Sequence, residues 1–260
     1  MRRTIVSAAI ALAALGLGAV AIAAESTPPL KHQHWHFTGP FGTYDRASAQ
    51  RGYQVYKEVC AACHSMSLLA YRNLVQLGLT EDQVKGLIAE IQVPDIGDDG
   101  SAIERPARLS DHFKKPFANE LAAAAANGGK APPDLSVIIK AREHGPDYVY
   151  SLLTGYVPFD KLTPAQIKEF QVVKDDNFNL YFPGHKIAMP PPLSDDKVTY
   201  ADGTKATLDQ EARDVVEFLA WASEPHLEER NRTGIRVILF LLALSGLMYA
   251  VKRQVWADQH

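Results

Sequence analysis

The chain has 260 residues, of which 47% are hydrophobic, and this ordinary globular composition excludes a mainly disordered protein. The formal net charge is only −3, but residues 24–229 hold 20 basic and 29 acidic side chains, and such an acidic body argues against nucleic-acid binding. The two cysteines lie three positions apart, which excludes a disulfide framework.

The first 24 residues have the pattern of a secretory signal peptide. Arg2 and Arg3 precede an apolar run over residues 5–24 that ends in the small-residue sequence Ala-Ile-Ala. We therefore expect residues 1–24 to be a signal peptide of an exported bacterial protein. A retained N-terminal anchor is the alternative, whereas the amphipathic pattern of an organellar transit peptide is not present.

Helices are expected to be the regular elements of residues 25–229, between loops rich in proline and glycine. The predicted helices cover about residues 48–59, 118–126, 148–153 and 207–224. In the last of these, Thr207 and Gln210 are expected to form a capping box, and apolar residues follow at helical spacing. No convincing alternating strand pattern is present, so the fold is predicted to be mainly α.

Residues 60–64 read Cys-Ala-Ala-Cys-His, which is the attachment signature of c-type haem. Two thiols one helical turn apart can add to the two vinyl groups of haem, and the adjacent histidine then faces the iron. A redox pair lacks a thioredoxin-like strand before it, and a zinc site lacks two further soft ligands. We therefore predict one covalently attached haem, held by Cys60 and Cys63 and ligated by His64.

The second axial ligand of an electron-transferring haem is usually Met or His. Three of the four methionines are excluded as this ligand by their positions. Met1 lies in the signal peptide, Met66 is only two residues past His64, and Met248 lies in the apolar C-terminal run. Met189 remains, in a segment stiffened by the three prolines that follow it. A gap-filling core methionine is the alternative for Met189. The competing ligands are histidines, His185 first, then His112 and His144.

His64 needs a hydrogen-bond partner for its other ring nitrogen, and such partners are usually a backbone carbonyl or a carboxylate. The loop over residues 131–135, which reads Ala-Pro-Pro-Asp-Leu and follows a Gly-Gly turn, is a plausible source of this partner. A surface connector without that role is the alternative.

Residues 237–251 carry no charged side chain and are flanked by Arg236 and by Lys252 and Arg253. A membrane-spanning helix needs about 20 apolar residues, with a lower limit near 17, and long basic side chains at its ends can reach the interface. We expect a transmembrane helix over 233–252, with a buried core helix as the alternative. The signal peptide then places residues 25–229 outside the cytoplasm and residues 253–260 in a cytoplasmic tail.

Motifs along nearly the whole mature chain resemble the cytochrome c1 family, whose members are haem subunits of the cytochrome bc1 complex (ubiquinol–cytochrome c oxidoreductase, complex III). The matching segments include residues 35–42, 52–56, 60–66, 71–72, 127–128, 132–136, 147–156, 181–184, 187–190 and 218–221, followed by the C-terminal apolar run. Cys-x-x-Cys-His alone would not select this family, whereas its combination with the long interval to Met189 and the Pro-Pro-Asp-Leu-Ser run does.

The resemblance implies a class I cytochrome c-like haem domain with long loop insertions over residues 25–229. It implies Met189 as sixth ligand and Arg142 as the partner of a haem propionate. Four further positions match the haem pocket of the family: Asn127, Pro132, Pro133 and Tyr148. The chain departs from many members in its uninterrupted alanine run at 122–126, and it has no spare cysteine for the disulfide that braces the Met loop in some bacterial relatives.

The resemblance also implies a function in electron transfer, without independent bond-making catalysis. The haem would accept electrons from a Rieske iron–sulfur protein and pass them to a soluble or membrane-bound c-type cytochrome. The chain would lie beside cytochrome b in a dimeric complex of the bacterial inner membrane, with its haem domain in the periplasm. The alternatives are a free-standing membrane-tethered electron shuttle and a haem sensor or gas-binding enzyme with an open sixth site.

Overall fold

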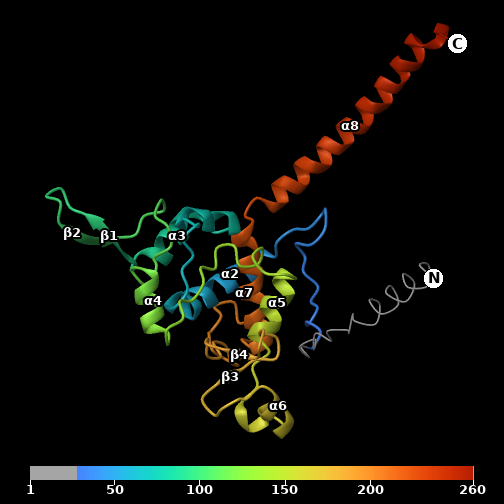
Figure 1. Cartoon of the computed structure of the whole chain (residues 1–260). Helices are drawn as coiled ribbons and strands as arrows, with labels where there is room; N and C mark the ends of the chain where they lie inside the picture. The colour runs from blue at the N-terminus through green and yellow to red at the C-terminus, as the bar shows by residue number, and fades with distance from the viewer. Residues whose placement is uncertain (1–27, 260) are drawn as a thin grey trace, which may run out of the picture.

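The computed structural model describes residues 28–259, so the predicted signal peptide lies outside the described residues. A helical head domain is followed by a long helix, α8 (Leu227–Val255), which projects from the head by itself (Figure 1). The helices of the head are α2 (Arg46–Glu58), α3 (Glu81–Ile88), α4 (Glu120–Ala126), α5 (Gly145–Leu153), α6 (Pro164–Glu169) and α7 (Leu208–Ser223). Short 3-10 helices are η1 (Cys60–Ala62), η2 (Tyr71–Leu77), η3 (Phe159–Lys161) and η4 (Ala257–Gln259).

The four helices predicted in the head are present as α2, α4, α5 and α7, with ends shifted by up to three residues, and the fold is mainly α as expected. Two short helices and two small antiparallel hairpins were not predicted. The hairpins pair β1 (Gln92–Ile96) with β2 (Ala102–Pro106) and β3 (Asn177–Phe178) with β4 (Lys186–Ile187). Their strands are too short, or too mixed in polarity, to produce a readable alternation.

Helix α7 begins where Thr207 accepts a hydrogen bond from the backbone N–H of Gln210 at 3.2 Å. Only this half of the predicted capping box forms, because the Gln210 side chain turns forward and donates to Asp214 at 3.0 Å. Asp214 is completely buried and also binds the Arg51 guanidinium of α2 through both carboxylate oxygens, at 2.9 Å each. The Gln210 side chain thus supports Asp214 within α7, and Asp214 in turn links α7 to α2.

Helices α2 and α7 cross at Gly52, and this crossing lies at the centre of the core. A Cβ added to Gly52 would lie 1.9 Å from the backbone oxygen of Asp214 and 2.7 Å from Cβ of Phe218. Tyr53 and Tyr56 of α2 pack against the Phe218 ring, with centroids 5.6 and 5.7 Å away. The crossing therefore fixes the C-terminal end of α2, and with it the cysteine motif that follows.

Helix α8 is long and apolar enough to cross a membrane, and none of its most apolar window is buried in the structure. At 1.5 Å per residue its 29 residues span about 44 Å. Its exposed apolar surface is inconsistent with the alternative of a buried core helix. The helix begins six residues before the predicted span of 233–252 and continues three residues past it.

Candidate haem-attachment site

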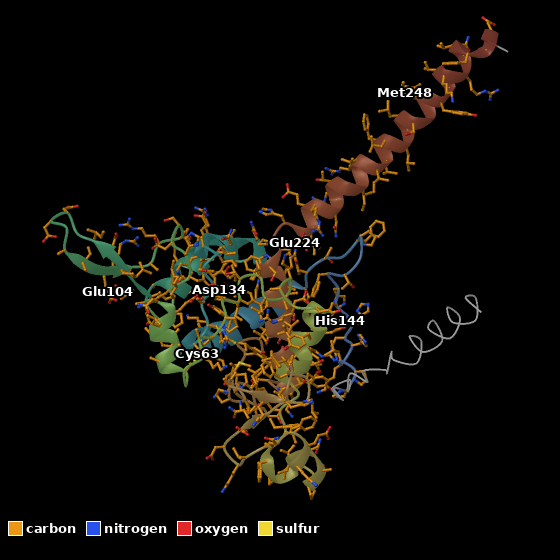
Figure 2. The ribbon with its side chains drawn as sticks, viewed as in Figure 1. Cys63, Glu104, Asp134, His144, Glu224 and Met248 are labelled. Carbon is orange, nitrogen blue, oxygen red and sulfur yellow. The ribbon has the colours of Figure 1, made fainter. Side chains whose placement is uncertain are left out.

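The cysteine motif forms a tight turn directly after α2. The backbone N–H groups of Cys63 and His64 both donate to the carbonyl of Cys60, at 3.1 and 2.9 Å. This turn leaves the two thiols in different surroundings, because Cys60 is partly buried against the core and Cys63 is exposed. Burial, together with the nearby Cys63, raises the pKa of the Cys60 thiol to about 12. Cys63 lies on the part of the head that faces away from α8 (Figure 2).

The His64 ring is oriented by the Pro-Pro loop, as the sequence predicted. Its Nδ1–H donates to the carbonyl of Pro133 at 2.8 Å, while the Tyr56 hydroxyl donates to the His64 backbone oxygen at 3.3 Å. Burial lowers the pKa of His64 and outweighs the opposing effect of the Pro133 carbonyl. A neutral imidazole whose Nδ1 carries the proton leaves its Nε2 lone pair available to a metal.

Asp134 locks this loop to the segment that follows His64. Its carboxylate accepts hydrogen bonds from the Ser65 hydroxyl at 2.8 Å, from the Ser67 hydroxyl at 2.6 Å and from the Ser67 N–H at 2.9 Å. It also accepts from the N–H of Ser136 at 2.8 Å. Burial by itself raises the pKa of Asp134, but the hydrogen bonds from Ser136 and Ser67 outweigh it and hold that pKa well below its usual range.

Asp134 holds the candidate site together, and the sequence assigned it no individual role. Its position inside the Pro-Pro-Asp-Leu-Ser run was the only signal. Figure 2 shows Asp134 in the same head domain as Cys63, and the bonds to Ser65 and Ser67 place it beside the attachment turn.

Asn127 ends α4 and starts the turn that leads to the Pro-Pro loop. Its side-chain amide donates to the carbonyl of Ala123 at 2.8 Å, and its own N–H donates to Ala124. Gly128 and Gly129 follow with φ of +62° and +84°, in the left-handed region that glycine adopts most easily. The predicted pocket position is therefore a helix cap, and the glycine turn after it leads the chain to Pro132 and Pro133.

Arg142 lies three residues before α5, and Tyr148 lies within that helix, close enough for the two side chains to interact electrostatically. The charge of Arg142 lowers the pKa of the Tyr148 phenol, although burial of that phenol outweighs it and raises the pKa overall. The exposed guanidinium donates only to the neighbouring carbonyl of Ala141, at 2.9 Å, and within residues 28–259 it pairs with no carboxylate. An Arg without an acidic partner suits an anionic group such as a haem propionate.

Met189 is partly buried, and its backbone oxygen accepts a hydrogen bond from the Tyr156 hydroxyl at 3.1 Å. In the described part of the chain no hydrogen bond joins it to the attachment turn, so its role as sixth ligand stays a prediction. The other two methionines of residues 28–259 are unsuitable, because Met66 is wholly buried in the core and Met248 is exposed on α8.

His185, the main competitor for the sixth position, is enclosed by aromatic rings. It is 2% exposed, and its ring lies 4.3 Å from that of Phe170 and 5.4 Å from that of Phe178, between centroids. Its Nδ1 bonds to the carbonyl of Asn179 at 3.0 Å. The aromatic rings that enclose His185 disfavour it as an iron ligand, although its Nε2 has no hydrogen-bond partner within residues 28–259. His112 and His144 are both exposed.

The donor set fits a c-type haem. Two thiols on one turn can form the two thioether attachments, while an oriented neutral imidazole and a thioether on a proline-rich segment are the two types of axial ligand that such a haem uses. A zinc site is not supported, because no group of three or more His, Cys, Asp or Glu side chains in residues 28–259 is arranged to hold a metal ion.

Comparison with known proteins agrees with this donor set. The model of the Cytochrome C1 family matches residues 35–259. "Cytochrome c1" of Rhodospirillum rubrum is 48% identical, over 99% of this chain and 97% of the relative. "Cytochrome c1, heme protein, mitochondrial" of Saccharomyces cerevisiae is 47% identical, over 86% of this chain and 71% of the relative. "Cytochrome b/c1" of Bradyrhizobium diazoefficiens is 44% identical over 99% of this chain, which spans 41% of that longer protein.

Proposed function

The chain belongs to the cytochrome c1 family of haem electron-transfer subunits, and we propose that it carries one haem attached through Cys60 and Cys63, with His64 and Met189 as axial ligands. The observation that supports this most directly is the orientation of His64 by Pro133, together with the anchoring of that loop by Asp134. A bound c-type haem supplies a reversible one-electron couple.

The surrounding residues would set the properties of that couple. His64 presents a neutral Nε2 at a fixed angle, and the Asp134 bonds prevent the ligand turn and the Pro-Pro loop from moving apart. Arg142 would pair with a propionate, while Asn127, Pro132, Pro133 and Tyr148 would line the pocket. Met189 would close the second face, so that the iron exchanges electrons without binding a substrate.

The family acts within ubiquinol–cytochrome c oxidoreductase as a redox subunit. We propose that the haem accepts electrons from a Rieske iron–sulfur protein and passes them to a c-type cytochrome. Cytochrome b is the proposed neighbour in the membrane, and the relative named "Cytochrome b/c1" supports this pairing. The proposed location is the bacterial inner membrane, with α8 as the single anchor, the head in the periplasm and the complex as a dimer.

Detergent extraction of membranes tests this proposal against its rivals. We expect the chain to co-purify with a b-type cytochrome and an iron–sulfur protein, and its reduced haem to be unreactive toward carbon monoxide. Migration as a lone monomer would support the membrane-tethered shuttle instead. Carbon monoxide binding to the native reduced protein would indicate an open sixth site and would contradict Met189 ligation.

A further inference from the structure

Among residues 28–226, which precede α8, one Phe, Trp or Tyr side chain is exposed, and it lies on a hydrogen-bonded turn beside that helix. The segment before α2 contains four large aromatic residues, and three of them, Trp35, Phe37 and Tyr44, are at most 8% exposed. The fourth, Phe41, is 80% exposed. A single exposed apolar residue is common, so its meaning depends on how and where it is held.

The turn that carries Phe41 is closed by a backbone hydrogen bond and packs tightly against the preceding segment. Gly39 has φ of +82°, and its carbonyl accepts the N–H of Gly42 at 3.2 Å, so Pro40 and Phe41 occupy the two central positions of a tight turn. A Cβ added to Gly42 would lie 2.2 Å from the carbonyl oxygen of Phe37, which shows how closely the turn folds back on itself. The central side chains of such a turn point outward, and here the tip is apolar.

The turn lies alongside the first part of α8, and its contacts with that helix extend toward the apolar run. The N–H of Tyr44 donates to Glu228 at 2.8 Å, and further along α8 the side-chain amide of Asn231 donates to the Gly39 carbonyl at 3.3 Å. The two terminal guanidinium nitrogens of Arg46 donate to Glu228, at 2.9 and 2.8 Å. Figure 1 shows this loop rising beside the base of α8. Phe41 therefore lies between two fixed points and next to the start of the anchor.

With α8 crossing a bilayer, this turn, held between the levels of Glu228 and Asn231, would lie near the headgroup layer. Asn231 lies two residues before the predicted span at Thr233 and six before the charge-free run at Val237, which is about 3–9 Å along the helix axis. The polar layer on each side of a membrane is about 5–8 Å thick. A side chain at the tip of a turn at this level can insert its ring among the headgroups and upper acyl chains.

We propose that Phe41, with Pro40, is a second membrane contact, which inserts into the outer bilayer surface beside α8. The proposal rests on the proposed anchoring of α8 in the membrane. A wedge at the side of the helix gives the head two points of contact with the bilayer, so the head cannot rotate freely about the axis of α8.

Site-directed spin labelling of the full-length holoprotein tests this contact. In the holoprotein Cys60 and Cys63 are consumed by thioether bonds, so a thiol introduced by Phe41→Cys is the only reactive one, and the unsubstituted protein should take up no label. The matched control is Leu121→Cys, because Leu121 is 83% exposed and lies on α4 of the head. Met248→Cys, within the apolar run, reports the depth of α8 itself.

The labelled chains are reconstituted in vesicles of phosphatidylethanolamine and phosphatidylglycerol, and the collision rates of each label with oxygen and with a water-soluble nickel chelate are measured. We expect an oxygen-to-nickel ratio several-fold higher at position 41 than at position 121. An oxygen-to-nickel ratio at position 41 equal to that at position 121 would contradict the proposed membrane contact. Shielding of position 41 from both reagents by protein would contradict it as well. Nickel access at position 248 would refute the membrane anchor, and the wedge with it.

Discussion

At the scale of single residues, the candidate site depends on polar groups that hold the ligands rather than on the ligands alone. The His64 ring is oriented because its Nδ1–H donates to the Pro133 carbonyl, and Pro133 stays in place because Asp134 binds Ser65 and Ser67. Outer contacts of this kind commonly determine ligand orientation and redox properties. They come from residues 69 positions apart in the chain.

Met189→Leu is expected to abolish thioether ligation and to lower the haem potential, because a leucine side chain cannot bind iron. Absorption spectroscopy and redox titration of intact membranes measure both effects. The matched control is Met66→Leu, a volume-conserving change in the core that should cost less than about 1.5 kcal/mol and leave the spectrum intact. An unchanged spectrum in Met189→Leu would remove Met189 from the ligand set.

His185 is expected to position Met189 through the small hairpin that precedes it. Its Nδ1 and its backbone oxygen both bond to the backbone of Asn179, and Asn179 donates from its side chain to Leu152 of α5 at 2.7 Å. The Tyr156 hydroxyl then reaches the carbonyl of Met189. These hydrogen bonds connect the hairpin, α5 and the segment of Met189.

We expect His185→Leu to lower the free energy of unfolding by about 1–3 kcal/mol, since it leaves a buried carbonyl unpaired, and to lower the haem potential. His185→Asn should restore both in part, because Asn tolerates the left-handed backbone at φ of +59° and retains an amide donor. Thermal unfolding and redox titration are the measurements. A loss of stability with an unchanged potential would show that His185 does not act on Met189.

At the scale of elements, the crossing of α2 and α7 is the most sensitive contact of the head. Gly52→Ala is expected to destabilise the fold by about 3 kcal/mol or more, because the new methyl group would collide with backbone of α7. Gly86→Ala in α3 is the control, since nothing lies within 4 Å of its Cβ position. That change should stabilise the protein by about 0.5–1 kcal/mol, and equal thermal unfolding of the two variants would contradict the packing described.

Glu217 makes the α2–α7 interface sensitive to pH. Burial, and then the nearby charges of Asp45 and Asp214, raise the pKa of Glu217 to about 7, against the opposing hydrogen bond from the Asp45 N–H. A carboxyl whose pKa is raised on folding binds its proton more tightly in the folded state. The free energy of unfolding therefore increases as the pH falls from 8 toward about 4.5, the pKa of this carboxyl in the unfolded chain. It decreases as the pH rises through 7.

Glu217→Gln is expected to raise stability at pH 8 by on the order of 1–2 kcal/mol, with the gain vanishing near pH 4.5. The amide keeps an oxygen that can accept from Asp45. Denaturant unfolding across this pH range is the measurement, with the exposed Glu229→Gln as control. A pH-independent difference between Glu217→Gln and the parent would rule out titration of Glu217.

The elements differ in how far local sequence predicts them. Helices α2 and α7 were predictable because apolar residues recur over three or more turns and polar caps mark their starts. Helices α3 and α6 are only 8 and 6 residues long, and the strands of the second hairpin have 2 each, too few for a period to be read. The cysteine motif is local and was read directly, whereas the Asp134 contacts are long-range and required the structure.

At the scale of the whole molecule, the head and the anchor are joined rigidly. Leu227 is buried in the core of the head, and Glu228 binds Arg46 and Tyr44, so the first turn of α8 belongs to the head as much as to the anchor. Lys140 and Arg230 both pair with Glu224 just before this turn. The orientation of the site relative to the membrane is thus set by ion pairs outside the bilayer.

Truncation after Thr233 is expected to release the head from the membrane with its haem spectrum and melting temperature unchanged, because Leu227, Glu228 and Asn231 remain. Truncation after Glu224 should also give a soluble head, but one that melts at a lower temperature, because the joint is lost. Membrane fractionation and thermal unfolding test both variants. Equal melting temperatures would mean that the joint does not stabilise the head.

The unequal exposure of the two cysteines has a consequence for maturation. Attack on an oxidant requires a thiolate, and burial keeps the Cys60 sulfur protonated, with its pKa near 12. Cys63 is exposed. A folded chain that has not yet received its cofactor therefore offers oxidants chiefly one sulfur atom. Oxidative damage in an oxidising compartment would begin at Cys63. Once both sulfurs have formed thioether bonds to the haem, the chain has no thiol left that can be oxidised.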